Sequence, residues 1–119
     1  MQPSRDVSET LPLTHLSFHI LLALATENLH GYAVIKAVKS NPANPLSPGT
    51  GTFYSAISRM LDEDLIMEVE SPAEESSDQR RRYYSITDFG RQVLAAETRR
   101  LEALVQFAQA AVATSSTQK

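Results

Sequence analysis

A proline- and glycine-rich segment at residues 41–51 constrains the fold more than any other part of the chain. It holds three prolines and two glycines. Proline lacks a backbone N–H and cannot continue a helix, and a cluster of these residues marks a loop. The helical patterns on either side of this segment therefore belong to two separate helices.

Apolar residues at helical spacing predict two helices before this loop. The first begins near Leu13, with Thr14 as its N-cap, and stops at Asn28, which tolerates a left-handed conformation. The second spans about residues 30–40. Three residues share its inward face: Tyr32, Ile35 and Val38. Residues 1–12 contain two prolines and no periodicity, and they predict a loose N-terminal arm.

After the loop, a third helix is expected from about residue 52 to about residue 64. Because the pair Gly-Thr occurs twice, at residues 49–50 and 51–52, its start can also lie two residues away. Apolar residues share one face of this helix: Phe53, Ile57, Met60 and Leu61. Polar residues share the other: Thr52, Tyr54, Ser55, Ser58 and Arg59.

Two strands follow the third helix. Residues 65–70 alternate between apolar and acidic side chains, which predicts a half-buried strand with Leu65, Met67 and Val69 facing inward. The polar segment at residues 71–79 is expected to form the tip of a hairpin, and residues 82–86 return as its second strand.

The order of these elements indicates the fold class, which is mainly α with a small β-hairpin. A winged helix-turn-helix domain is expected over residues 13–86, and Thr87 caps a long C-terminal helix over residues 87–113. Residues 114–119 are expected to form a flexible tail. In a winged helix, the helix before the hairpin enters the major groove of DNA and the hairpin tip reaches the backbone.

The composition sets limits on partners and location. The net charge of −3 argues against DNA, but the positions of the cations matter more than their sum, and Arg80, Arg81 and Arg82 are consecutive. The chain has no cysteine, which excludes disulfides and thiolate metal sites. No apolar run is long enough to span a bilayer, and the N-terminus lacks the pattern of a signal peptide. A cytoplasmic protein without a membrane partner is therefore expected.

Several short motifs occur in a characteristic order. They are His-Gly-Tyr at residues 30–32, Gly-Thr-Phe-Tyr-Ser-Ala-Ile at 51–57, Arg-Met at 59–60, Leu-Ile at 65–66, and Arg-Arg-Tyr-Tyr-Ser-Ile-Thr at 81–87 with Gly90. In this order they resemble the PadR family of transcription regulators over roughly residues 13–112. The resemblance implies a winged-helix repressor that is dimeric through its terminal helices and is often released from its operator by a small molecule.

The chain departs from the family pattern at two positions. The family commonly has proline where Ser55 stands and glycine where Asp64 stands. Asp64 must therefore adopt the turn conformation itself, which aspartate tolerates better than most residues.

Candidate DNA contacts lie on the third helix and on the wing. They are Thr50, Thr52, Tyr54, Ser55, Ser58, Arg59, Arg80, Arg81, Arg82 and Tyr83. Hydroxyl groups can bond to phosphates or base edges, and Arg59 can pair with a guanine or with a phosphate. Because strand side chains alternate, only some of the three consecutive arginines can face DNA, and one can instead pair with Glu68 or Glu70 across the hairpin.

The final helix is the second informative element. It extends on the order of 40 Å, which exceeds the width of a compact winged helix. Its apolar stripe needs a partner, and a second copy of the chain suits a palindromic operator. The expected dimer interface comprises Leu16, Ile20, Leu94, Leu101, Leu104, Val105, Ala108 and Val112. The alternative is that the helix folds back over the first helix of its own chain.

Single sequence features bear on further ligands and functions. Small residues on the last helix leave room for an apolar or aromatic effector between the subunits: Ala95, Ala96, Ala103 and Ala108. His15 and His19, at positions i and i+4, resemble a metal pair but lack a third ligand, so no metal or cofactor is expected. No catalytic motif occurs, so an enzyme is not expected. A protein-interaction module that uses an acidic surface remains the alternative function.

Overall fold

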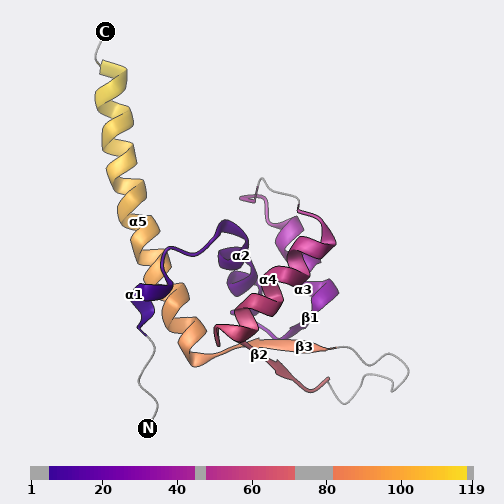
Figure 1. Ribbon diagram of the computed structural model, residues 1–119. Coiled ribbons are helices and arrows are strands. Elements are labelled where there is room, and N and C mark those ends of the chain that lie inside the picture. The colour runs from indigo at the N-terminus through magenta and orange to yellow at the C-terminus, as the bar shows by residue number, and fades with distance from the viewer. Residues whose placement is uncertain (1–5, 45–47, 72–81, 118–119) are drawn as a thin grey trace.

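The computed structural model describes residues 6–44, 48–71 and 82–117 (Figure 1). The chain is mostly helical with one small antiparallel sheet, which confirms the expected fold class. Its elements in chain order are α1 (Val7–Thr10), α2 (His15–Leu24), β1 (Leu29–His30), α3 (Gly31–Ser40), α4 (Thr50–Asp62), β2 (Ile66–Val69), β3 (Tyr83–Ile86) and α5 (Asp88–Thr117). The expected hairpin tip lies outside the described residues.

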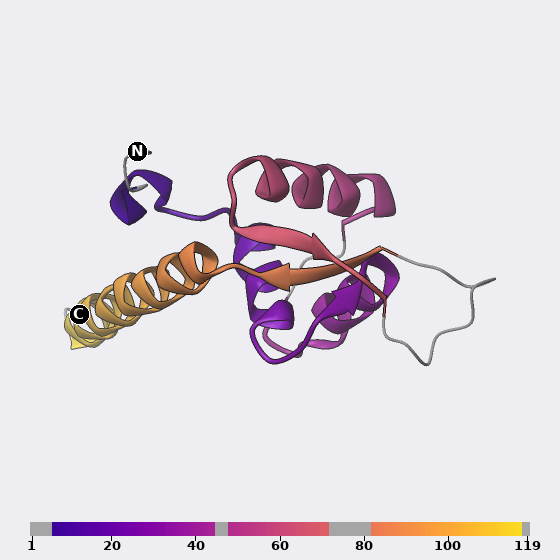
Figure 2. The ribbon, with the colours of Figure 1, turned by 90° about the horizontal axis from the view of Figure 1, so that it is seen from below.

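Helices α2, α3 and α4 enclose the apolar core, and the sheet lies beneath them (Figures 1 and 2). Helix α4 contributes four buried residues, which are Phe53, Ala56, Ile57 and Met60. Helix α2 begins as the sequence predicts, because the hydroxyl of Thr14 accepts a hydrogen bond of 3.0 Å from the backbone N–H of Ser17. Helix α3 begins in a related way, with the Nδ1 atom of His30 accepting from the backbone N–H of Ala33.

The sheet differs from the expected hairpin in two ways. Its strand order is β1-β3-β2, so the short strand β1 makes it three-stranded. The predicted alternation of the first wing strand is also wrong, because Ile66 is buried and Met67 is 48% exposed. Strand β2 takes its phase from its pairing with β3, in which Ile66 lies opposite the buried Ile86. Leu65 precedes the strand in a turn and is buried independently of this alternation.

Two turns meet where α5 begins. Asp64 has a φ of 60°, as the sequence required of it. The hydroxyl of Thr87 donates to the carbonyl oxygens of Asp64 and Leu65, at 2.6 and 3.1 Å, and accepts from the N–H of Gly90. A Cβ atom on Gly90 would lie 2.1 Å from the carbonyl oxygen of Leu65. Only glycine therefore allows α5 to approach this turn so closely.

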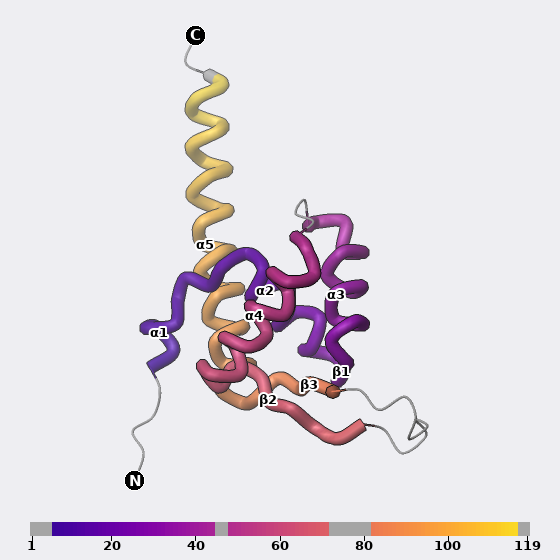
Figure 3. Tube along the Cα trace, turned by 45° about the vertical axis from the view of Figure 1, so that its right-hand side comes forward, coloured from indigo at the N-terminus to yellow at the C-terminus, as the bar shows by residue number. Residues whose placement is uncertain are grey.

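The N-terminal segment corrects the expectation of a loose arm. Residues 7–10 form α1, which lies beside α5 in two different views (Figures 1 and 3). Asp6 caps α1 by accepting from the N–H of Ser8. Val7 and Leu11 are half-buried against the core, and burial of these apolar side chains explains why the segment is held.

Other boundaries differ from the expectations. Asn28 is not left-handed, because α2 ends at Leu24 with a right-handed cap at Ala25. Tyr32 is 66% exposed, and Val34 takes its place beside Ile35 and Val38 on the buried face of α3. Helix α4 starts at the first of the two Gly-Thr pairs. Helix α5 continues to Thr117, so the tail expected to be flexible is largely helical.

Candidate nucleic-acid interface

The polar face of α4 is exposed as the sequence predicts. Thr50, Thr52, Tyr54, Ser55, Ser58 and Arg59 are all exposed. The N-cap is Gly49, and within the described chain no side chain caps the helix. The first backbone N–H groups of α4 are therefore left for water or an external acceptor, and the helix dipole favours a negative charge there.

The two ends of α4 differ in charge. Its first turn has no acidic residue, whereas Asp62, Glu63 and Asp64 follow one another at its C-terminal end. A phosphate backbone is attracted to the first end and repelled by the second. The charge distribution therefore favours an orientation in which the N-terminal half of α4 meets DNA.

A pocket of about 310 Å³ lies between the start of α3, helix α4 and the wing. It is lined by His30, Gly31, Tyr32, Tyr54, Arg82 and Tyr84. The ring of Tyr54 lies so close to Gly31 that a Cβ atom at that position would be 2.8 Å from its hydroxyl oxygen. Gly31 therefore lets the Tyr54 hydroxyl, the start of α3 and the Arg82 side chain share one concave surface.

The pocket carries donors that suit an anion. Burial raises the pKa of Tyr84, Glu68 raises it further, and Arg82 opposes both effects by its charge and by a hydrogen bond. The hydroxyl of Tyr84 is therefore protonated at neutral pH. Arg82 lies 4.0 Å from Glu68, but both side chains are at least half exposed, so the pair is weak and a phosphate can compete for the guanidinium.

Arg59 has a partner that the sequence did not indicate. Its Nη2 atom donates to the hydroxyl of Ser17 on α2, at 3.2 Å. Arg59 also lies in the last turn of α4, whereas recognition helices commonly contact bases with their N-terminal residues. The structure thus places Arg59 on the exposed face of α4 while tying it to α2.

Three candidate DNA contacts remain on the wing: Arg80, Arg81 and Tyr83. Arg80 and Arg81 lie outside the described residues. Tyr83 is half-buried and packs edge-on against His30, with ring centroids 5.4 Å apart. Tyr83 therefore supports the pocket wall.

The residues expected at a dimer interface differ in how far their own chain buries them. Ile20 is completely buried in the core of its own chain, so its place in the expected interface is wrong. Leu16 and Leu94 pack half-buried against that same core. The outer residues of the stripe are exposed: Leu104, Val105, Ala108 and Val112. Leu101 is half-buried where the two parts meet, and Phe107, which the sequence analysis did not select, is 75% exposed.

The two histidines on α2 contact each other, and one of them contacts Asn44. The rings of His15 and His19 lie 4.4 Å apart, and His15 Nε2 is 3.1 Å from the side-chain oxygen of Asn44. Burial, and then the neighbouring His15, lower the pKa of His19. Among the described residues no group of three potential ligands could hold a metal ion.

None of the described helices is long and apolar enough to cross a membrane.

Comparison with known proteins identifies the family. A model of the transcriptional regulator PadR-like family matches residues 20–96. The chain belongs to the PadR-like family of transcriptional regulators. This membership confirms the expectation of a transcription regulator rather than an enzyme. A search of curated proteins gave no match.

Solved structures share the fold of this PadR-like chain. A PadR family transcription regulator from Clostridium difficile matches with a TM-score of 0.73 and 25% identity, over 83% of this chain and 99% of that one. A transcriptional regulator from Clostridium thermocellum matches with a TM-score of 0.67 and 21% identity, over 91% and 96% of the two chains. Bacillus subtilis PadR, solved in complex with operator DNA, matches with a TM-score of 0.60 and 24% identity, over 71% of this chain and 47% of that one.

Proposed function

We propose that this PadR-like regulator binds double-stranded DNA as a homodimer, with the N-terminal half of α4 in the major groove. The observation that carries the proposal is the continuous donor surface formed by the exposed start of α4 and the adjoining pocket. The acidic residues at the C-terminal end of α4, Asp62, Glu63 and Asp64, lie away from this approach. The fold shared with Bacillus subtilis PadR, which was solved with operator DNA, agrees with this use of the domain.

The pocket beside α4 is proposed to seat a phosphate of the DNA backbone. Tyr54 and Arg82 supply donors from two different elements, and the start of α3 adds the positive end of its helix dipole. Arg80 and Arg81 are proposed to extend this backbone contact along the wing. Thr50, Thr52, Ser55 and Ser58 then face the groove, where their hydroxyls can reach base edges or phosphates.

The partner protomer is proposed to cover the outer half of α5. Leu104 and Val105 are each 51% exposed and Val112 is 67% exposed, which is unfavourable for apolar side chains in water. A two-fold dimer would pair these stripes and present two copies of α4 to half-sites about one helical turn apart.

Repression, with release by a small apolar or aromatic effector between the subunits, completes the proposal. Its support is the resemblance to the PadR family and the run of small residues along α5. Ala103 and Ala108 are exposed on the part of α5 that a partner would cover, and they leave space beside the larger side chains.

Selection of duplexes from a random pool, followed by binding across a salt series, tests the function. The proposal expects an enriched inverted repeat and an affinity for it that falls steeply with salt. A protein that enriches no sequence and binds no duplex at low salt is not a DNA-binding regulator. That result would favour a winged helix used as a protein-interaction module.

A further inference from the structure

Helix α5 leaves the rest of the chain at a buried carboxylate. Within described α5, the fully buried positions are Gly90, Val93 and Glu97, and Glu97 is 1% exposed. Leu101, one turn further on, is half-buried, and every described side chain beyond it is exposed. Glu97 is thus the outermost buried residue of the helix, at the point where the exposed outer half of α5 separates from the rest of the domain.

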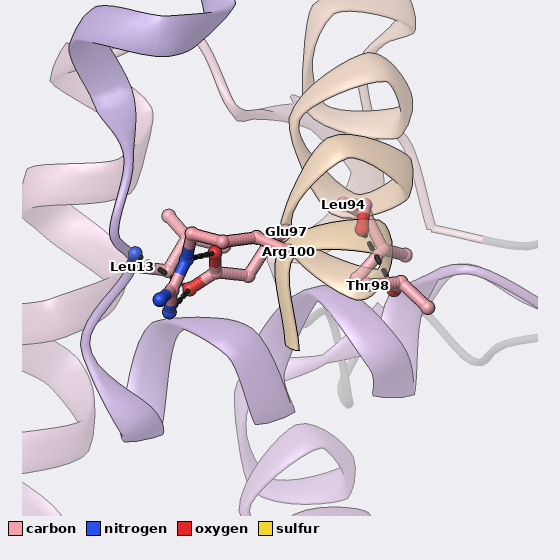
Figure 4. Close-up of polar contacts among 5 residues, drawn as sticks. All are labelled: Leu13, Leu94, Glu97, Thr98 and Arg100. Atoms are coloured by element: carbon pink, nitrogen blue, oxygen red, sulfur yellow. Dashed lines mark hydrogen bonds and ion pairs between the residues drawn. The ribbon is translucent and has the colours of Figure 1, made fainter. Parts of the chain in front are cut away.

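Glu97 holds this position through directional contacts (Figure 4). Its Oε2 atom accepts a hydrogen bond of 2.9 Å from the backbone N–H of Leu13, a residue distant in the sequence. Arg100 binds the same carboxylate with two nitrogen atoms, Nε and Nη2, at 2.5 and 3.0 Å. Thr98, one residue away, bonds only back to the carbonyl oxygen of Leu94 within α5. Glu97 alone among these side chains ties α5 to the N-terminal segment.

The carboxylate is ionised despite its burial. The hydrogen bond from Arg100 lowers the pKa of Glu97, burial opposes this effect, and the Leu13 N–H lowers the pKa further. A carboxylate that accepts hydrogen bonds from two partners specifies one relative orientation of the segments it joins. Apolar contacts, in contrast, allow neighbouring helices to slide. An ionic contact at this position therefore suits the fixing of an angle.

A chain of contacts continues from Glu97 to α4. Leu13 precedes Thr14, whose hydroxyl caps α2 by accepting from the N–H of Ser17. The hydroxyl of Ser17 in turn accepts from Arg59 on α4. The first turn of α2 is therefore held at one side by α5 and at the other by the helix that faces DNA.

We propose that Glu97 is a positioning residue that fixes the angle between α5 and the DNA-binding domain, and thereby sets the half-site spacing that the dimer accepts. The second part rests on the proposed function, since it requires a dimer that binds two half-sites. The first part concerns a single chain. Two measurements therefore test the parts separately.

The first measurement is a distance within one protomer. Because the chain has no cysteine, spin labels can be attached at Ser55→Cys on α4 and Gln109→Cys on the outer half of α5. Labelled protein is diluted with excess unlabelled protein, so that distances between protomers do not contribute. Glu97→Leu, which has no acceptor for Leu13 or Arg100, is expected to broaden the distance distribution.

Matched variants control for charge and local helix stability. Thr98→Val alters the adjacent position, and Glu102→Gln removes an exposed carboxylate from the same helix. Both are expected to keep the narrow distribution of the parent protein. Glu97→Gln keeps an oxygen that can accept from Leu13 and is expected to give a smaller broadening. It keeps the test decisive if the leucine variant does not fold, although apolar replacement of a buried ion pair is often tolerated.

The second measurement is binding to duplexes whose half-sites are one or two base pairs closer or further apart than in the selected operator. The preference of Glu97→Leu for the selected spacing is expected to fall about fivefold or more, the lower end of typical coupling between sites. Its affinity for an isolated half-site is expected to match that of the parent protein, because α4 and the pocket are unchanged.

The outcomes separate the two ideas. Unchanged distance distributions in both Glu97 variants would overturn the positioning role, whatever the result of the DNA-binding measurements. Broadened distributions with an unchanged spacing preference would overturn the link to half-site spacing. If the parent protein binds no duplex while the Glu97 variants broaden the distribution, the proposed function fails and the fixed angle remains.

Discussion

Helices α4 and α5 each expose a face that no other described part of the chain covers, but the two faces have opposite chemistry. The exposed face of α4 is rich in hydroxyls, whereas the outer half of α5 exposes leucine, valine and phenylalanine. A polar face is stable in water and gains from a partner only by specific hydrogen bonds or charge. An apolar face gains from any partner that removes it from water. The first therefore predicts a ligand with donors, acceptors and charge, and the second predicts another apolar helix.

The largest expected effect comes from placing a charge on the apolar face. Leu104→Asp should give monomers in sedimentation at tens of micromolar, because an interface cannot bury the unpaired carboxylate. Operator affinity should then fall on the order of 10²-fold or more, as the advantage of two linked half-sites is lost. Gln106→Asp, on the opposite side of α5, is the matched control and should remain dimeric. A Leu104→Asp dimer would show that this face of α5 is not the interface.

A smaller effect is expected on the polar face of α4. There, replacing Arg59 tests whether its side chain contacts a base or instead supports α4 through its hydrogen bond to Ser17. Base contact by Arg59 predicts that Arg59→Ala costs about 1–3 kcal/mol on the selected operator and relaxes its preference at one position in each half-site. Support of α4 through Ser17 predicts instead equal losses on operator and scrambled duplexes. Ser17→Ala removes the partner of Arg59 but leaves the guanidinium in place. Binding of both variants to operator and scrambled duplexes compares the two roles. Equal losses on both duplexes for Arg59→Ala would remove Arg59 from base recognition.

A still smaller and less selective effect is expected at the pocket. Arg82→Ala should weaken binding to all duplexes alike and reduce the slope of log affinity against log salt by about one unit. Arg99→Ala removes an exposed cation from α5, away from α4, and should leave the slope unchanged. A loss confined to the operator would show that Arg82 contacts a base rather than a phosphate.

The sequence predicted the elements whose signals are local. The N-cap at Thr14, the polar face of α4, the left-handed Asp64 and the Thr87 cap all depend on neighbouring residues, and each is observed. The features that it missed depend on contacts distant in sequence. The phase of β2 follows from its pairing with β3, and α1 is held by its packing on α5.

The candidate site shows the same division. The motif at residues 30–32 was recognisable from the sequence. Glycine is needed at its centre because the ring of Tyr54, from another helix, leaves no room for a Cβ atom at Gly31. Glu97 had no distinguishing signal, because an isolated glutamate in a helix is usually solvent-exposed. One sign was available: Glu97 lies four residues after Val93 and four before Leu101, within the apolar stripe. A charged residue in such a stripe indicates a buried contact or an interruption, and spacing alone does not distinguish them.

The smallest expected effect concerns the junction between the two regions, where Glu97 joins α5 to the domain. Its folded-state pKa lies below the ordinary value of 4.5, so the native state favours the ionised form. The resulting stability is fully present above pH 4.5 and is lost as the pH falls through the lower, folded-state value. Denaturant midpoints measured from pH 6 downward should therefore decline less steeply for Glu97→Gln than for the parent protein. Glu102→Gln, which removes an exposed carboxylate from the same helix, is the control for the change in charge. Parallel curves for the parent protein and Glu97→Gln would mean that the carboxylate gains nothing on folding, and that its contact with Leu13 and Arg100 does not hold α5 to the domain.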